Sequence, residues 1–240
     1  MTSLLDKVAI ITGGGSGIGR SIAIALANEG AFPIICGRRK DRLIETVKSI
    51  MEIGGSAHFF PADVSVEEDV AQLVETILKN FDKIDILINN AAVFSEAPVH
   101  ELEISEWDRQ MSTNLRGPFL LVREILPGMR QRRSGHIINI SSESGIEYYE
   151  NDSSYGTTKH ALNAFGEYIQ RENQEYNIRV DTICPGMVVT EMTEDTPGLD
   201  HNKCLYPDDI AELAIWLLTR RGNIKIGTPI LIQTMQNPWT

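Results

Sequence analysis

The chain has 240 residues, of which 42% are hydrophobic and 23% are charged, a composition typical of a globular protein with one α/β domain or two small ones. Its 33 acidic and 22 basic side chains give a net charge of −11, which argues against nucleic acid or an anionic membrane surface as the main partner. The three cysteines show neither disulfide nor metal-ligand spacing, and no signal-peptide pattern or membrane-length apolar run is present. We therefore expect a protein of the reduced cytoplasm that holds no metal.

Short apolar runs alternate with segments of helical periodicity along the chain. The runs predicted to be strands are residues 7–12, 32–36, 57–61, 84–88, 136–140, 179–184 and 229–232. The segments predicted to be helices are residues 17–30, 39–53, 66–81, 105–131, 154–176 and 207–219. Gly117 and Pro118 invite a kink in the fourth of these helices. One irregular segment, residues 191–206, is rich in Thr, Asp, Asn, Pro and Gly, and a loop of this length is more often functional than idle.

The predicted strands are short and apolar on both faces, which indicates a parallel sheet covered on both sides by helices. The chain contains no internal repeat and no domain linker. The predicted fold is a doubly wound α/β domain of the Rossmann type with about seven strands. It spans residues 1–240 and carries a substrate loop at about residues 191–206.

A glycine-rich turn, Thr12-Gly13-Gly14-Gly15-Ser16-Gly17-Ile18-Gly19, joins the first predicted strand to the first helix. Glycines in such a turn let the backbone approach a pyrophosphate closely and let helix and strand pack together. The helix N-terminus adds free N–H groups and a partial positive charge for the phosphates. A glycine-rich turn alone is a weak signal, but one that follows a strand and opens a helix predicts dinucleotide binding. The alternative, a purely structural turn, does not account for so many glycines in eight residues.

The end of the second strand distinguishes NADP from NAD. An acidic residue there would bind the ribose hydroxyls of NAD, whereas this chain has Arg38 and Arg39. A guanidinium can pair with a 2′-phosphate through two hydrogen bonds and can stack on adenine. NADP(H) is therefore favoured and NAD(H) is the alternative; in the competing interpretation, the arginines are simply solvated at a helix start. Asp63, after the third strand, is predicted to contact adenine, and its alternative role is to cap the helix that begins near Ser65.

Tyr155 and Lys159 lie four residues apart on a predicted helix, so their side chains share one face at about 5–6 Å between Cβ atoms. An ammonium beside a phenol favours the ionised phenol and lowers the pKa of the tyrosine from its ordinary value of about 10. Such a tyrosine can serve as the general acid and base that alcohol–ketone interconversion requires. Tyr-x-x-x-Lys also occurs by chance on helix surfaces, so the pair gains its weight from the glycine-rich turn.

Together these motifs resemble those of the short-chain dehydrogenase/reductase family, in its compact single-domain branch, from residue 7 to about residue 232. They come in the family's order, with Thr12–Gly19 followed by Asp63, Asn89-Asn90-Ala91-Ala92, Asn114, Ser141-Ser142, Tyr155 with Lys159, and Pro185-Gly186 with Thr190. Two departures stand out. Ala92 replaces the glycine usual in the family, and residues 233–240 lack the usual Gly-Gly ending, which weakens any transfer of the family's tetramer or substrate class.

The resemblance implies four catalytic residues: Asn114, Ser142, Tyr155 and Lys159. Tyr155 would protonate the carbonyl oxygen, Lys159 would lower the tyrosine pKa and bind the nicotinamide ribose, and Ser142 would hold the substrate oxygen. Asn114 would hold a water that relays protons to Lys159. The implied cofactor-binding residues are Thr12, Gly13, Ser16, Gly17, Ile18, Gly19, Arg38, Arg39, Asp63, Val64, Asn90, Ala91, Tyr155, Lys159, Pro185, Gly186, Val188 and Thr190, and Asn89 would brace the sheet.

The predicted function is NADPH-dependent reduction of a small ketone or aldehyde. The main alternative is an NAD(P)-dependent alcohol dehydrogenase that works oxidatively, because the same residues serve both directions. A non-catalytic dinucleotide sensor is a third possibility, but a sensor has no chemical reason to keep the complete catalytic set.

Substrate specificity is expected from the residues that flank the catalytic set. These are residues 93–94, 143–150, 187–188 and 191–206, where acidic side chains suggest a neutral or cationic substrate; the alternative is that they are solvated surface charges. The helices predicted at residues 105–131 and 154–176 resemble those that form a four-helix dimer interface in the family. We therefore expect a homo-dimer or a homo-tetramer.

Overall fold

The computed structural model describes residues 3–240, so residues 1–2 of the predicted domain lie outside the described part of the chain. The strands are β1 (Val8–Thr12), β2 (Phe32–Gly37), β3 (His58–Pro61), β4 (Ile86–Asn89), β5 (Gly135–Ile140), β6 (Ile178–Pro185) and β7 (Ile230–Ile232). The α-helices are α1 (Gly17–Asn28), α2 (Lys40–Glu52), α3 (Glu67–Phe81), α4 (Ile104–Met111), α5 (Gly117–Arg132), α6 (Ser153–Asn173) and α7 (Pro207–Leu218). Within residues 3–240, no helix has the length and apolar character needed to cross a membrane.

The strands form one parallel sheet in the order β3-β2-β1-β4-β5-β6-β7. The chain moves outward from β1 to β3 and then from β4 to β7 on the opposite side, so the strand order reverses between β1 and β4. The prediction of a doubly wound parallel sheet with helices on both faces is confirmed. In such sheets ligands bind at the carboxyl ends of the strands, beside the point of reversal.

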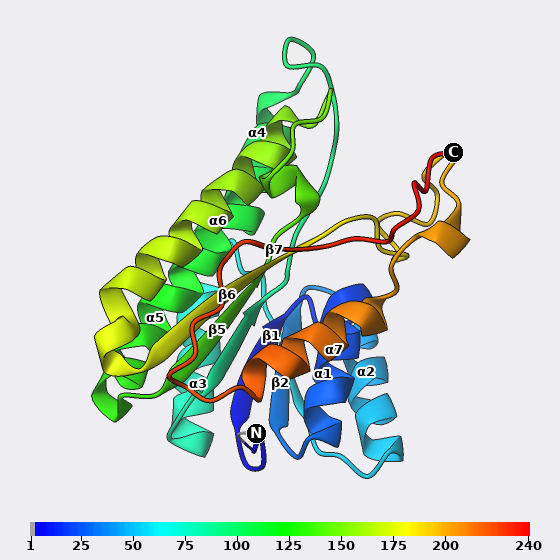
Figure 1. Cartoon of the computed structure of the whole chain (residues 1–240). Coiled ribbons are helices and arrows are strands. Elements are labelled where there is room, and N and C mark those ends of the chain that lie inside the picture. The colour runs from blue at the N-terminus through cyan, green and yellow to red at the C-terminus, as the bar shows by residue number, and fades with distance from the viewer. Residues whose placement is uncertain (1–2) are drawn as a thin grey trace.

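Helices cover both faces of the sheet (Figure 1), and an apolar core lies between the sheet and the helices on each face. Helices α1, α2 and α7 cover one face, where Ile22, Leu26 and Leu217 are fully buried. Helices α3, α5 and α6 cover the other face, and Leu73 and Leu120 are buried in its core. Every residue of β1 and of β6 is buried, as expected for strands that helices cover on both faces. Strand β1 is apolar up to Thr12, whereas β6 also buries Arg179 and Asp181, which form an ion pair.

The predicted helix at residues 105–131 is helical throughout, but its middle has a different winding. Between α4 and α5 the chain forms a π-helix, η1 (Ser112–Arg116), in which the Gly117 N–H donates to the Ser112 carbonyl. Pro118 has no N–H to donate to the carbonyl four residues earlier, that of Asn114. The wider winding thus lies just before the proline, where the sequence suggested a kink. A π-turn of this kind is frequent at functional sites.

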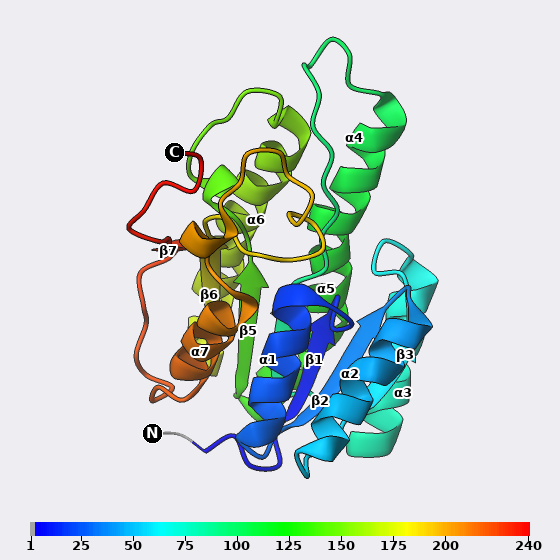
Figure 2. The same ribbon diagram turned by 90° about the vertical axis from the view of Figure 1, so that its right-hand side faces the viewer.

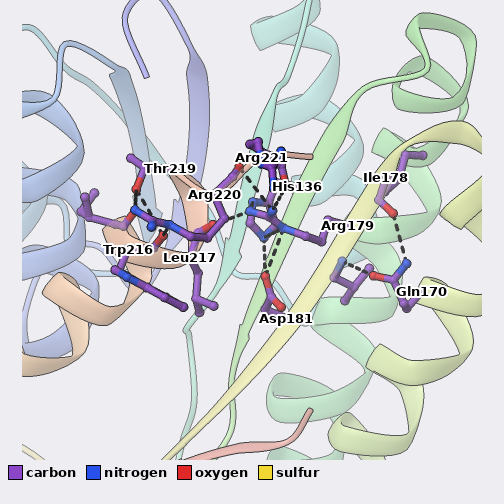
Figure 3. Close-up of polar contacts among 12 residues, drawn as sticks. His136, Gln170, Ile178, Arg179, Asp181, Trp216, Leu217, Thr219, Arg220 and Arg221 are labelled. Atoms are coloured by element: carbon purple, nitrogen blue, oxygen red, sulfur yellow. Dashed lines mark hydrogen bonds and ion pairs between the residues drawn. The ribbon is translucent and has the colours of Figure 1, made fainter. Parts of the chain in front are cut away.

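A buried ionic cluster ties β5, β6 and α7 together at the amino end of the sheet (Figure 3). His136 Nε2 lies 2.7 Å from Asp181 Oδ2, and Arg179 donates to His136 Nδ1 at 3.0 Å. Arg179 also forms an ion pair with Asp181 at 3.4 Å between Nε and Oδ2. The guanidinium donates as well to backbone carbonyls at the end of α7, those of Leu217, Arg220 and Arg221. These hydrogen bonds tie the guanidinium to the last turn of α7 and to the residues that follow it.

The loop predicted at residues 191–206 contains only one short 3₁₀ turn, η4 (His201–Lys203). The C-terminal segment lies along this turn, as both views of the ribbon show (Figures 1 and 2). The Asp200 N–H donates to the Pro238 carbonyl at 2.9 Å, and the Thr234 hydroxyl donates to the Lys203 carbonyl at 2.7 Å. Residues 233–240, the part that departs from the family's pattern, therefore brace the loop.

Candidate active site

The glycine-rich turn passes directly against the end of β4, which explains where glycine is required. Gly13 has a φ of +66°, and a Cβ there would lie 2.8 Å from the Asn90 side-chain nitrogen. A Cβ on Gly19 would lie 2.5 Å from that same atom. The Thr12 hydroxyl accepts hydrogen bonds from the N–H groups of Asn90 and Ala91, each at 2.9 Å. Thr12 and Gly19 thus shape the turn from behind and do not line the cavity in front of it.

A cavity of about 530 Å³ opens at the carboxyl ends of β1 and β4. It is the crevice that the reversal of strand order predicts. It extends from Arg39 and Asp63, past the glycine turn, to Tyr155 and Lys159. The predicted site residues that line it are Gly13, Ser16, Gly17, Ile18, Arg38, Arg39, Asp63, Val64, Asn90, Ala91, Tyr155, Lys159 and Thr190.

The residues present fit a nicotinamide dinucleotide. The N-terminus of α1 carries no acidic residue in its first turn and no side-chain cap on Ser16, so its N–H groups are free to meet a phosphate. Arg38 and Arg39 supply cations at one end of the cavity. Asp63 lines the cavity, while its Oδ1 accepts hydrogen bonds from the N–H and hydroxyl of Ser65. The alternative that Asp63 caps the next helix is wrong, because α3 begins at Glu67 with Val66 in the cap position.

Tyr155 lies on the first turn of α6, and its ring meets Phe94 edge to face at 5.1 Å between centroids. Burial raises the pKa of Tyr155 above its ordinary value, and a hydrogen bond with Ser142 opposes that rise. The prediction of a lowered pKa is therefore wrong for this structure. The physical reason is that the penalty for burying a phenolate exceeds the stabilisation that its neighbours supply.

Lys159 is 2% exposed, and its ammonium lies 5.3 Å from the centroid of the Tyr155 ring. Its Nζ donates to the Ile140 carbonyl at 2.9 Å. Burial lowers the pKa of Lys159 from 10.5 to about 8. The two residues thus share a helix face as predicted, but the ammonium is held by the end of β5 rather than by the phenol.

Asn114 lies in the π-turn η1, fully buried and behind the cavity. Its Oδ1 accepts from the Val93 N–H at 2.8 Å, while its Nδ2 donates to the Val93 carbonyl at 2.9 Å and to the Thr158 hydroxyl at 3.2 Å. It therefore joins the loop after β4 to the helix that carries Tyr155 and Lys159. Ser142 also lies outside the cavity wall, and its hydroxyl accepts from the Ser144 N–H at 3.1 Å.

The remaining predicted cofactor residues follow β6. Pro185 ends this strand, and the Gly186 N–H donates to the Ile232 carbonyl at 2.8 Å. Val188 is buried and pairs with Leu205, so it anchors the loop and does not line the cavity. Thr190 does line the cavity, and its side chain faces the glycine-rich turn, where a Cβ on Gly17 would lie 3.1 Å from it.

Sequence reasoning missed part of the cavity wall. Arg42 lines it one turn into α2, and Glu191 reaches it from the loop after β6. Glu191 forms ion pairs with Arg39 at 2.7 Å and with Arg42 at 3.2 Å. The position of Arg42, three residues after Arg39 on a helix, is a signal that could have indicated a shared face. Glu191 was expected only as part of the substrate loop at residues 191–206 and not beside the arginines, because only the fold brings this loop to α2.

A cavity lined by a glycine-rich turn and by a tyrosine–lysine pair is the arrangement expected of a nicotinamide-dinucleotide oxidoreductase. The family model described as short chain dehydrogenase matches residues 7–198, and the chain belongs to this family. An uncharacterised oxidoreductase of Staphylococcus aureus (strain MRSA252) is 34% identical over 227 residues, which are 95% of this chain and 97% of that protein. The resemblance deduced from the motifs is thus confirmed.

Two solved structures share the whole fold. An alcohol dehydrogenase from the archaeon Thermococcus sibiricus, complexed with 5-hydroxy-NADP, is 28% identical with a TM-score of 0.88 and covers 97% of this chain and 98% of its own. Levodione reductase is 28% identical with a TM-score of 0.89 and covers 95% of this chain and 96% of its own. The protein is therefore an oxidoreductase of the short-chain family, which uses NAD(P). Within residues 3–240, no group of His, Cys, Asp and Glu side chains is arranged to hold a metal ion.

Proposed function

We propose that the protein is an NADPH-dependent reductase of a small ketone or aldehyde and that residues 1–240 work as one domain. The observation that carries this proposal is that Arg38 and Arg39 line the same cavity as Tyr155 and Lys159. A 2′-phosphate fits the first pair of side chains, and a carbonyl oxygen fits the second pair. The likeness to a dehydrogenase solved with 5-hydroxy-NADP supports the choice of NADP(H), and the likeness to levodione reductase supports the reductive direction.

The bound cofactor supplies the hydride, and the chain's own residues handle the proton. Tyr155, whose pKa is raised by burial, stays protonated at neutral pH and donates its phenolic proton to the substrate oxygen. Ser142 donates to that oxygen and holds it against Tyr155. The Lys159 ammonium, 5.3 Å from the ring, stabilises the phenolate that remains. Asn114 positions α6 through its hydrogen bond to Thr158. We also propose that Asn114 holds a water that relays protons to Lys159.

The oxidative alternative uses the same residues in reverse, with Tyr155 as the base. One observation favours it, namely the likeness to the archaeal alcohol dehydrogenase. The raised pKa of Tyr155 disfavours a phenolate base near neutral pH and so supports reduction in that range.

The test is NADPH oxidation against a panel of small ketones, aldehydes and quinones, with Tyr155→Phe measured beside the wild type. We expect wild-type turnover to fall by about 10²–10⁴-fold in the variant, the range typical of a lost general acid. Full turnover in Tyr155→Phe would exclude Tyr155 as the acid. NADPH binding without turnover in either direction would favour a dinucleotide sensor.

The choice of cofactor is tested separately, with dissociation constants for NADPH and NADH. We expect NADPH to bind more tightly and Arg39→Ala to weaken NADPH alone, because only NADPH carries the 2′-phosphate. Equal binding of both cofactors, unchanged in Arg39→Ala, would leave NAD(H) as the better choice.

A neutral or cationic substrate remains the proposed class. Glu143 follows Ser142 directly, and its carboxylate accepts from the Gln233 side chain at 2.7 Å, while a Cβ on Gly186 would lie 3.1 Å from it. Burial raises the pKa of Glu143, and the hydrogen bond from Gln233 opposes this. Matched ketones with ammonium and carboxylate substituents test the proposal. A higher kcat/KM for the carboxylate would contradict it.

We also propose that the protein forms a homo-dimer or a homo-tetramer. Helices α5 and α6 lie side by side on one face of the sheet (Figure 1). An apolar groove is lined by residues of α4, η1, α5 and α6, among them Phe119, which is 46% exposed. Small side chains of α6, Ala161 and Ala164, line the groove and would let a second copy approach closely. Light scattering distinguishes a monomer, dimer and tetramer, and Phe119→Asp is expected to give the monomer.

The free thiols of the three cysteines support the proposed reduced cytoplasmic setting.

A further inference from the structure

Arg39, one of the two arginines proposed to receive the 2′-phosphate, and the neighbouring Arg42 already share an anion that belongs to the protein. Glu191 forms ion pairs through Oε2 with Arg39 Nη2 at 2.7 Å and through Oε1 with Arg42 Nη2 at 3.2 Å. All three side chains line the cofactor cavity. The Glu191 carboxylate thus bridges two guanidinium groups, as a phosphate would.

The bridge is placed where it must compete with a phosphate. Arg39 also donates to the hydroxyl of Ser16, which precedes α1 at the phosphate turn. Its guanidinium therefore lies between the turn and the Glu191 loop. Arg38, one residue earlier, forms no ion pair with any residue of the described chain. Arg42 also pairs through Nη1 with Glu45 at 3.3 Å, so Glu191 is one of its two carboxylate partners.

The bridge is also weak enough to open. The side chains of Arg39, Arg42 and Glu191 are 54%, 44% and 37% exposed, respectively. Exposed ion pairs contribute little to stability because water screens them. A nucleotide phosphate carries close to two negative charges and three acceptor oxygens, against one charge and two oxygens for a carboxylate. Exchange of Glu191 for a 2′-phosphate is therefore electrostatically favourable.

Opening the bridge would release a specific stretch of chain. The N–H groups of Met192, Thr193 and Glu194 all donate to Thr190, at 3.3, 3.0 and 2.9 Å. These residues form the turn that presents Glu191 to the arginines. The same loop continues to residue 206 and lies among the segments expected to choose the substrate.

We propose that Glu191 is a specificity-determining residue that competes with the cofactor's 2′-phosphate for Arg39 and Arg42, so that NADP(H), but not NAD(H), releases the loop that begins at Thr190. This inference rests on the proposed use of NADP(H). By thermodynamic linkage, a ligand that breaks the bridge loosens the loop, and a substitution that removes the bridge strengthens binding of that ligand.

The first experiment measures binding by calorimetry and needs no turnover. Adenosine 2′,5′-bisphosphate is the probe, and adenosine 5′-monophosphate is the matched ligand without the 2′-phosphate. Glu191→Gln is expected to tighten binding of the bisphosphate by about fivefold, consistent with the loss of two exposed ion pairs. Binding of the monophosphate is expected to stay within about twofold, since it has no 2′-phosphate to compete with Glu191. Glu194→Gln, an exposed residue of the same loop, is the control for the loss of one negative charge.

The second experiment measures amide hydrogen exchange in residues 190–196. The bisphosphate is expected to speed exchange of the Met192, Thr193 and Glu194 amides in the wild type, and the monophosphate is not. In Glu191→Gln these amides are expected to exchange at a fast rate that neither ligand changes.

The binding data distinguish failure of the Glu191 competition from failure of the NADP(H) assignment. If the wild type prefers the bisphosphate but Glu191→Gln binds it no more tightly than Glu194→Gln does, the competition is overturned and the proposed cofactor stands. If the wild type binds both probes equally and Arg39→Ala changes neither affinity, both the NADP(H) assignment and the competition are overturned. Weaker bisphosphate binding in Glu191→Gln would show that Glu191 supports the site rather than competing for it.

Discussion

Two buried cations, Lys159 and Arg179, lie at opposite ends of the same sheet and differ in whether a carboxylate pairs with them. Lys159 is 2% exposed, donates to the carbonyl at the carboxyl end of β5, and forms no ion pair with a carboxylate in residues 3–240. Arg179 is 7% exposed at the amino end of β6 and binds Asp181, His136 and carbonyls at the end of α7. One charge is left without a counter-ion beside the cavity, and the other is fully paired.

The difference separates a functional end of the sheet from a structural end. A buried charge without a counter-ion is costly, and its pKa moves toward the neutral form, as that of Lys159 does. Such a group costs stability but is available to a phenolate or to a ribose hydroxyl. At the amino end of the sheet, the N–H groups of Arg179 all donate to acceptors of the protein. The Arg179 guanidinium therefore joins β5, β6 and α7 and has no free donor for a ligand.

Replacing Lys159 is expected to give the largest effect and to move activity and stability in opposite directions. Lys159→Met should lower turnover by about 10²–10⁴-fold, as loss of proton-transfer machinery does. The same substitution should raise the free energy of unfolding at pH 7 by about 1–3 kcal/mol, because a pKa lowered from 10.5 to about 8 reflects a buried charge that the variant lacks. Denaturant unfolding and steady-state kinetics measure the two quantities.

The stability difference between Lys159→Met and the wild type should also depend on pH. Folding lowers the pKa of Lys159, so its destabilising effect is complete below about pH 8 and disappears as the pH approaches 10.5. The stability gap between Lys159→Met and wild type should therefore shrink over that interval. Lys79→Met, at an exposed position of α3, is the control and should show no such trend. A destabilised Lys159→Met would mean that the carbonyl of Ile140 alone stabilises the ammonium.

Replacing Arg179 should have the converse result. Arg179→Met is expected to lower the free energy of unfolding by about 3–5 kcal/mol, because it leaves Asp181 buried without a cation. The kcat/KM of the folded fraction should stay within about twofold, since this end of the sheet is remote from Tyr155. Urea unfolding measures the loss. The double variant Arg179→Met with Asp181→Leu should recover part of it, and a double variant as unstable as the single one would contradict a charge-based cause.

The smallest effect is expected from His136, through the pH dependence of stability. Burial lowers the pKa of His136, and the hydrogen bond to Asp181 opposes this. The unfolded chain therefore takes up a proton first as the pH falls below about 6.5, and the wild type loses stability over that window. Between pH 7 and 5.5 the loss due to this group should be about 1 kcal/mol. His136→Gln should lack it, whereas His58→Gln, at an exposed position, should retain it; equal slopes in all three proteins would place the titration elsewhere.

The local patterns were sufficient to predict the fold and most of the cofactor cavity. Strands that are apolar along their whole length can only be buried on both faces, so the alternation of strands and helices led directly to a doubly wound sheet. Gly13 and Gly19 were identifiable because the backbone around a phosphate turn tolerates no side chain. Tyr155 and Lys159 share a helix face, and helix geometry sets that relation within four residues.

The environment of those groups depended on segments far apart in the sequence. The direction of the Tyr155 pKa shift was wrong because desolvation depends on what covers the phenol, including Phe94 from the loop after β4. The Glu191 bridge joins residues about 150 positions apart, a separation across which no local pattern acts. By itself, the sequence determined the family, the fold and the tyrosine–lysine pair on one helix face, since these follow from short-range spacing. Only the tertiary structure decided which charges are buried and which are paired, because burial and pairing depend on where the packed chain excludes water.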